Sequence, residues 1–151
     1  MITATQLPLL KAHFTELLSL SGFRPTRTDD DDIKFRVEGM QHVLDFYDKD
    51  PAYVRVLVPG FFDIESADEL QRAYIAASDT CKTVKGAKVF VYDEHLVSLT
   101  VEYLVTSLEM VDDGLISRHL SMTSSGMQHF RKKMEELEEL AGVAAKAGLV
   151  H

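Results

Sequence analysis

The stretch Ile33–Pro59 constrains the fold most strongly, because apolar and charged residues alternate along it in consecutive short segments. Residues 33–38 alternate at every position, which is the period of a β-strand with one buried face. Glu38-Gly39 predicts a tight turn, since glycine takes a positive φ without steric strain. A turn at Asp48–Pro51 separates two further segments. Residues 53–58 alternate cleanly, whereas residues 43–47 alternate less cleanly, so both faces of that strand are expected to be partly covered. The pattern predicts a meander of three antiparallel strands over residues 33–59.

Helical patterns flank this meander on both sides. Apolar residues at helical spacing predict a first helix over residues 7–18. A capping box at Ser66–Glu69 opens a middle helix over residues 66–85. A hairpin is predicted at 87–104, and an apolar stripe at steps of three and four predicts a last helix over 112–141.

The predicted order is therefore α-β-β-β-α-β-β-α. This order defines a single α+β domain over residues 1–151, with a five-stranded antiparallel sheet covered by helices on one face.

Charge and length exclude several classes of protein. The formal net charge of −8 argues against binding to a nucleic-acid backbone, which requires clustered lysine and arginine. No apolar run approaches the ~20 residues that span a bilayer, and the N-terminus lacks a signal-peptide pattern. The single cysteine, Cys81, cannot form an intrachain disulfide. We therefore expect a soluble cytoplasmic protein.

Metal and catalytic motifs are absent from the sequence. The run Asp29–Asp32 lacks the alternate ligands of a calcium loop and is read as a solvated acidic linker. None of the six histidines has metal-ligand spacing. Cys81 falls on the predicted apolar stripe of the middle helix and is expected to be a core cysteine. We expect no metal, no cofactor and no catalytic residue.

Exposed aromatic residues give the candidate binding site. Pro59-Gly60 predicts the end of the third strand, followed by an apolar loop at 60–63. Either both phenylalanine rings anchor this loop, or one plugs the core and the other, with Pro59 and Tyr53, lines a groove or an interface. If Val89 and Val91 face the core, the intervening aromatics lie on the outer face. The candidate partner-binding residues are Tyr53, Leu57, Phe61, Phe62, Phe90 and Tyr92.

The chain resembles the YbjN-type family of bacterial proteins, which are putative sensory-transduction regulators grouped with type III secretion chaperone-like peptide-binding folds. The resemblance rests on the element order and on four local features: Gly22-Phe23, the segment Asp32–Phe35, Asp50-Pro51, and the alanine-rich helix that ends over Lys82–Lys88. The family's middle-helix asparagines are replaced here by Ala76–Asp79. The resemblance implies a non-enzymatic domain that holds a peptide or protein partner, as a homodimer.

These observations leave three alternative functions for the chain. The first is a chaperone-like or regulatory adaptor that binds a partner by apolar contact on the sheet, or by adding a strand to a sheet edge. The second is a small hydrolase that uses Cys81 or a carboxylate. The third is a structural homodimer without a separate ligand, formed through the last helix or the outer sheet face.

Overall fold

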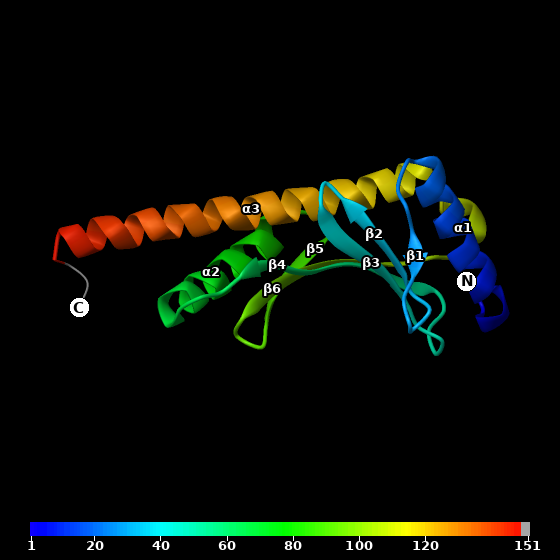
Figure 1. Ribbon diagram of the computed structural model, residues 1–151, viewed down its shortest axis with the longest axis horizontal. Helices are drawn as coiled ribbons and strands as arrows, with labels where there is room; N and C mark the ends of the chain where they lie inside the picture. The colour runs from blue at the N-terminus through cyan, green and yellow to red at the C-terminus, as the bar shows by residue number, and fades with distance from the viewer. Residues whose placement is uncertain (149–151) are drawn as a thin grey trace.

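The computed structural model describes residues 1–148 of the chain (Figure 1). Its helices are α1 (Leu7–Leu20), α2 (Ala67–Thr83) and α3 (Asp113–Lys146), with short 3-10 helices at Ala4–Gln6 and Leu108–Met110. Its strands are β1 (Thr26–Arg27), β2 (Ile33–Val37), β3 (Met40–Phe46), β4 (Tyr53–Asp63), β5 (Ala87–Tyr92) and β6 (Leu96–Leu104). The fold is α+β, with an antiparallel sheet and helices, as the sequence predicts.

The sheet has six strands in the spatial order β1-β2-β3-β4-β6-β5, so the prediction of five strands and its element order were wrong. The sequence predicts a polar linker over Arg24–Asp32, but the additional strand, β1, lies within it. Thr26 pairs with Lys34 and Arg27 with Ile33, and a turn at Thr28–Asp32 joins the two strands. A two-residue strand is too short to produce an alternating pattern in the sequence.

The β2–β3–β4 meander lies where the alternation placed it, but its last strand is longer than predicted. β4 does not stop at Pro59-Gly60, and residues 60–63 are not a loop. Gly60 has a φ of +55°, and the β4–β6 register shifts between Val58 and Phe62. The amide of Gly60 donates to the Ser98 hydroxyl at 3.0 Å. The strand therefore bends at a bulge and continues to Asp63.

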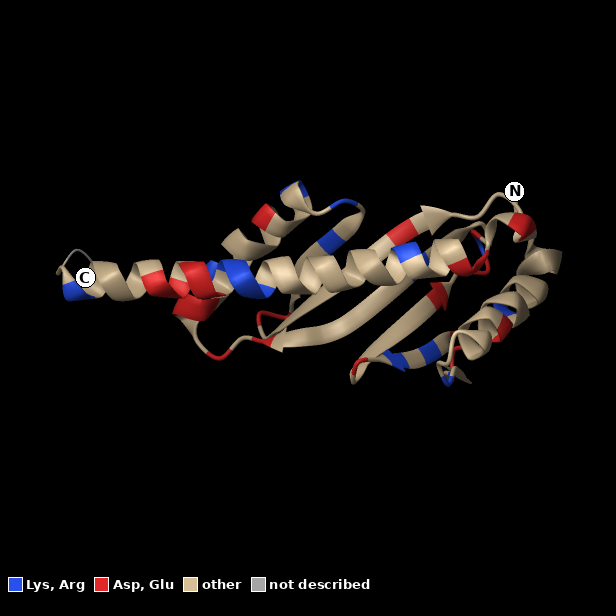
Figure 2. Cartoon of the chain, turned by 90° about the horizontal axis from the view of Figure 1, so that it is seen from above, with Lys and Arg blue, Asp and Glu red and all other residues tan. Residues whose placement is uncertain are grey.

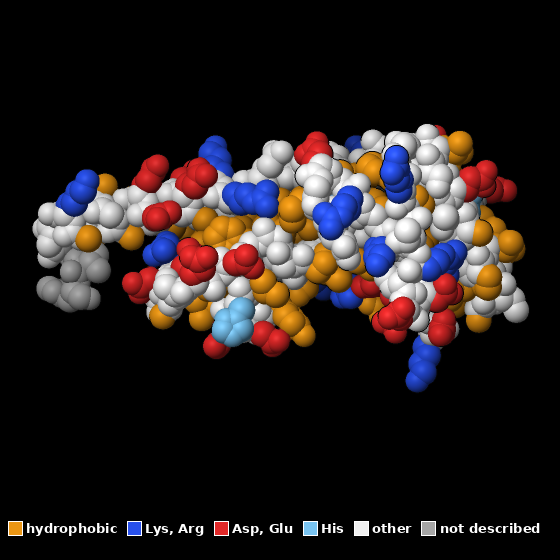
Figure 3. All heavy atoms as spheres, viewed as in Figure 1, with side chains coloured by type: hydrophobic (Ala, Val, Ile, Leu, Met, Phe, Trp, Pro, Cys, Tyr) orange, Lys and Arg blue, Asp and Glu red, His pale blue; other side chains and the backbone are white. Residues whose placement is uncertain are grey.

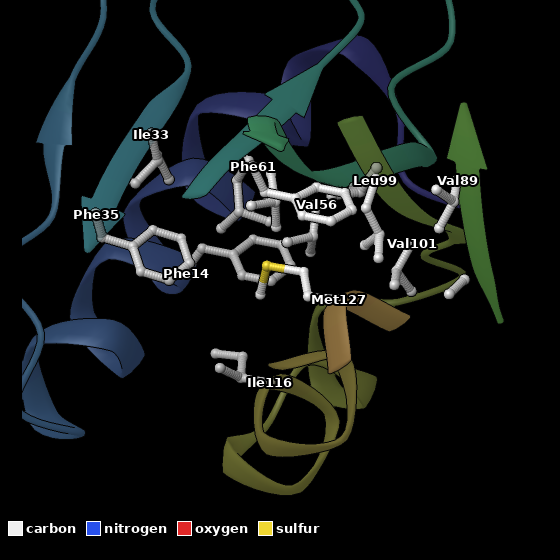
Figure 4. Close-up of a cluster of buried hydrophobic side chains, with 14 of the residues drawn as sticks. Phe14, Ile33, Phe35, Val56, Phe61, Val89, Leu99, Val101, Ile116 and Met127 are labelled. Carbon is white, nitrogen blue, oxygen red and sulfur yellow. The ribbon is translucent and has the colours of Figure 1, made fainter. Parts of the chain in front are cut away.

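Long helix α3 lies lengthwise over one face of the sheet, with α1 toward one end and α2 toward the other (Figures 1 and 2). The valines of β4 and the core-facing residues of β2, β5 and β6 meet Ile116 and Met127 of α3 in one cluster (Figure 4). Close approach is possible because α3 carries Gly126 where it crosses Leu99. Burial of this face provides the main driving force for folding.

Helix α2 buries a face that only partly matches the apolar stripe predicted from the sequence, which comprises Leu70, Ala73, Tyr74, Ala77, Cys81 and Val84. Its buried residues are Ala73, Ala76, Ala77 and Thr80, whereas Tyr74 is exposed. The small alanines pack against β5 and α3, which leaves no room on that side for a tyrosine. The placement of Cys81 in the core was also wrong, because this residue is exposed.

Helix α3 extends past the predicted end at residue 141 and remains helical to Lys146. Asp112 caps its start, with its carboxylate accepting from the amide of Leu115 at 2.8 Å. Beyond Leu137 the helix projects from the body, and Leu140 and Val143 are exposed. The sequence also predicts fraying over residues 142–151, but residues 142–146 are helical, and residues 149–151 lie outside the described residues.

Candidate binding surface

One face of the sheet is not covered by a helix and is here called the open face. In β4 the alternation buries Val54, Val56 and Val58 under α3 and turns Tyr53, Arg55 and Leu57 to the other side. The strand registers extend this division across the sheet. The open face carries Lys34, Arg36, Gln41, Val43, Asp45, Tyr53, Arg55, Leu57, Lys88, Phe90, Tyr92, Leu96, Ser98, Thr100, Glu102 and Leu104.

A single row of side chains crosses the open face at right angles to the strands. Lys34 lies opposite Val43, Val43 opposite Leu57, Leu57 opposite Thr100, and Thr100 opposite Lys88. Directly opposite residues in antiparallel strands have Cβ atoms ~5 Å apart, so these side chains are neighbours. Leu57 and Val43 form the apolar middle of the row and are half-buried.

An aromatic group occupies the β5 end of the open face. Val89 is 5% exposed and faces the core, so its neighbour Phe90 points to the open face and is half-buried. Tyr92 follows on the same side and is 56% exposed, opposite Leu96. This arrangement agrees with the expectation that both aromatics of β5 lie outside the core. Their rings add apolar surface to this end of the open face.

Tyr53 lies within a polar network at the start of β4, opposite Leu104 of β6. Tyr92 lies opposite Leu96, at the other end of β6. The ring of Tyr53 lies 5.2 Å from that of Tyr47, centroid to centroid. Burial, and then the neighbouring Glu102 carboxylate, raise the pKa of Tyr53 to about 12. Burial alone would raise the pKa of Glu102, yet the Lys88 ammonium at 2.6 Å helps to hold it below its ordinary value. Tyr53 is therefore neutral and Glu102 ionised at neutral pH.

A second ion pair lies beside this network. Nε of Arg55 donates to Oδ2 of Asp45 at 2.8 Å, and the Nη2 group donates to the same oxygen. At this end of the open face, the carboxylates of Asp45 and Glu102 are thus each paired with a cation. The charges of these side chains are therefore balanced.

Phe61 and Phe62 do not belong to the open face. Both rings pack against Phe130 of α3, with centroid distances of 5.4 and 5.2 Å. Phe61 is 6% exposed, and Arg131 lies over its ring and donates to its carbonyl oxygen at 3.2 Å. The six candidate residues therefore separate into four on the open face and two against α3.

The β5 edge of the sheet is occupied by the chain itself. The amide of Val89 donates to Sγ of Cys81 at 3.2 Å, and the thiol lies 3.4 Å from the Val89 carbonyl oxygen. Helix α2 packs along β5 at this edge. Natural sheets often cover an edge strand in this way, which prevents another strand from pairing with it.

The acidic run 29–32 is a turn tied to cations. Asp31 lies 3.4 Å from both Lys11 and Arg27, and the Asp32 carboxylate accepts from the amide of Phe46 at 2.9 Å. Burial raises the pKa of Asp32. Within residues 1–148, no group of three or more His, Cys, Asp or Glu side chains is placed to hold a metal ion.

Groups suited to acid–base chemistry lie apart from one another. His129 contacts Asp79 at 2.7 Å between α3 and α2, and this contact lowers the pKa of Asp79. His42 is buried, and burial lowers its pKa. In the described part of the chain, the hydrogen-bond partner of Cys81 is the Val89 backbone, not a base.

Sequence reasoning missed several residues of the open face: Val43, Leu96, Leu104 and the charged pairs. The alternation within β6 was visible, since Ser98, Thr100 and Glu102 were the polar members of its pattern. What the sequence did not contain is the pairing of β6 with β4, which brings Thr100 beside Leu57.

The fold and surface define a small α+β protein with helices on one sheet face and an apolar and charged open face on the other. Comparison with protein-family models and with curated proteins finds no match to the chain. The YbjN-type resemblance therefore stays a prediction. Among the helices of residues 1–148, none combines the length and hydropathy that a bilayer-spanning segment requires.

Proposed function

We propose that the chain is a non-enzymatic domain that binds a peptide or protein on the open face of its sheet. The observation that carries this proposal is the aromatic and aliphatic surface formed by Leu57, Phe90 and Tyr92. Leu57 lies on β4, and Phe90 and Tyr92 lie on β5, on the other side of β6. All three lie outside the helix-covered core. Apolar surface gathered on one face is typical of an interaction site.

The β5 edge of the sheet is covered, which favours a partner that contacts the open face over one that adds a strand beside β5. Cys81 and α2 occupy that edge at Val89. A partner that pairs with β5 would have to displace the thiol and the helix, whereas a partner on the open face displaces only water. The proposal thus favours side-chain recognition over strand addition at this edge.

The proposal includes a chaperone-like or regulatory role of the YbjN type and a cytoplasmic location. Support for the location comes from the single cysteine, whose thiol bonds to backbone groups and not to another sulfur. Support for the role comes from the open face and from local features that carry the resemblance, such as Gly22-Phe23, Asp32–Phe35 and Asp50-Pro51.

The test is selection of ligands from a random peptide display library on the immobilised chain, followed by fluorescence anisotropy of the enriched peptides. Binding should be lost in Leu57→Ser/Phe90→Ser and kept in Tyr74→Ser, which removes an exposed apolar side chain from α2 instead. Light scattering of the same proteins measures their mass. A dimer that dissociates on Phe90→Ser, without any selected peptide, would instead support the structural homodimer.

A further inference from the structure

A groove of about 470 Å³ opens at the β2 edge of the sheet, opposite the edge that carries Phe90. Residues 22–24, which lead into β1, form one wall together with Thr26. Residues 34–36 of β2 and Gln41 of β3 form the other wall. Lys34 and Arg36 project into the groove from β2, and both belong to the open face by register. The groove is therefore continuous with the proposed binding surface.

The groove concentrates positive charge in an acidic chain. Arg24, Lys34 and Arg36 are all exposed, and none of them forms a salt bridge within residues 1–148. In contrast, Arg27 and Lys88 each contact a carboxylate. Figure 3 shows lysine and arginine side chains gathered over β1 and β2.

The groove also presents free backbone groups. Glu38-Gly39 forms the two-residue β2–β3 turn, with φ values of 50° and 82°. In such a turn the flanking residues, Val37 and Met40, form a hydrogen-bonded pair. Alternation then directs the N–H and C=O of Arg36 away from β3. Strand β1 begins only at Thr26, opposite Lys34, so it stops short of Arg36.

The positive charge of the groove indicates that its ligand is an acidic segment. Arginine donates in a fork that matches a carboxylate, and the free Arg36 amide adds a further donor. The side chain of Arg36 is already positioned, because its Nη1 donates to the Gly39 carbonyl oxygen at 3.0 Å. Since the chain's net charge is −8, an acidic segment is repelled by most of the surface and attracted here.

We propose that the groove formed by Arg24, Lys34 and Arg36 binds acidic residues of the same extended peptide whose apolar residues contact Leu57 and Phe90. This inference rests on the proposed function and specifies the chemistry of its partner. Four strand spacings of ~4.8 Å separate β2 from β5, or about 19 Å. An extended chain covers that distance in about six residues. The ligand is thus a peptide with an aromatic or aliphatic anchor about six residues from a short acidic run.

The experiment uses fluorescein-labelled synthetic peptides that carry a Leu-Phe anchor, a Gly-Ser spacer and a run of glutamates. Spacers are shorter than, equal to, or longer than the proposed length, and a matched set has glutamine for glutamate. Anisotropy against the full chain should show tightest binding at about six spacer residues. The glutamine set should bind about fivefold more weakly, and added salt should remove the difference.

The double variant Arg24→Gln/Arg36→Gln should bind the glutamate peptide about fivefold more weakly than the parent chain does. Its affinity for the glutamine peptide should be unchanged. Its matched control, Arg118→Gln/Lys132→Gln, removes the same charge from exposed positions on α3 and should change neither. The substituted side chains are exposed in both variants, so folding should be unaffected.

The outcomes separate the two proposals. If Phe90→Ser abolishes binding but glutamate and glutamine peptides bind alike, the acidic specificity is wrong and the proposed function stands. If binding depends on Arg36 but not on Phe90, the groove is an independent anion site and the open face is not the binding surface. If no peptide binds, both proposals are wrong.

Discussion

The thiol of Cys81 closes the edge of the sheet by contacting both backbone groups of Val89, its Sγ lying 3.2 Å from the amide nitrogen and 3.4 Å from the carbonyl oxygen. In an antiparallel pair, alternate residues of an edge strand direct these groups outward. Val89 is such a residue, and a helical side chain takes the place of the missing strand. The edge is thereby closed without a further β-strand.

Replacing the thiol should expose this edge. We expect Cys81→Ala to destabilise the chain by about 1 kcal/mol, because Val89 loses its hydrogen-bond partner. Amide exchange of Val89, followed by NMR, should accelerate about fivefold, the factor that corresponds to this energy. Cys81→Ser keeps a donor and acceptor and should show a smaller effect. Equal exchange rates in the parent and Cys81→Ala would show that the thiol does not protect the edge.

The stacked rings of His119 and Tyr103 should make the free energy of unfolding fall as the pH is lowered. His119 is 7% exposed and stacks on Tyr103 with ring centroids 3.9 Å apart, and its Nδ1 has no partner within the described residues. Burial lowers the pKa of His119 to about 4 from its ordinary 6.5. Below pH 6.5 the unfolded chain therefore binds a proton that the folded chain does not, so stability present above pH 6.5 is lost as the pH falls toward 4.

This loss should be on the order of 2 kcal/mol, allowing for partial solvation, and urea denaturation at a series of pH values measures it. His119→Phe keeps an aromatic ring against Tyr103 but cannot titrate, so its stability should fall less steeply. Tyr103→Phe removes only the hydroxyl and should retain the parent's acid slope. If His119→Phe keeps that slope as well, the imidazole is not the responsible group.

Two glycines of α3 should respond oppositely to alanine. A Cβ at Gly126 would lie 2.4 Å from Cδ1 of Leu99 and 3.3 Å from Cβ of Ala87, whereas a Cβ at Gly142 meets nothing within 4 Å. Overpacking costs roughly 1–3 kcal/mol, and the gain in helix propensity offsets up to about 1 kcal/mol. Thermal denaturation should show Gly126→Ala destabilised and Gly142→Ala slightly stabilised. A stabilised Gly126→Ala would mean that Leu99 moves aside freely.

The sequence predicted those parts of the fold that have a local pattern. The alternation in Ile33–Val37 placed β2, and the capping box at Ser66 placed the start of α2, whose Ser66 hydroxyl accepts from the amide of Glu69 at 3.1 Å. It failed where tertiary packing decides. The buried face of α2 follows from alanines meeting β5, and the bulge at Gly60 follows from pairing with β6.

The candidate site was predicted in part for the same reason. Alternation in β5 is local, so it indicated the side of the strand on which Phe90 and Tyr92 lie. The basic groove was missed, because Arg24 and Arg36 are twelve residues apart in the sequence and meet only when β1 pairs with β2. Their separate positions in a polar linker and an alternating strand gave no reason to group them.

Candidate residues in the core and on the open face should differ in how much their substitution changes stability and peptide binding. Phe61 is packed against Phe130, so Phe61→Ala should destabilise the chain by about 3–4 kcal/mol through lost burial and a cavity. Tyr92 is 56% exposed, so Tyr92→Ala should change stability by no more than about 0.5 kcal/mol. Urea denaturation midpoints at equal slope measure both. Peptide binding should respond in the reverse order: lost in Tyr92→Ala, and retained by the folded fraction of Phe61→Ala. A large stability loss in Tyr92→Ala would instead place its ring in the core and remove it from the proposed binding surface.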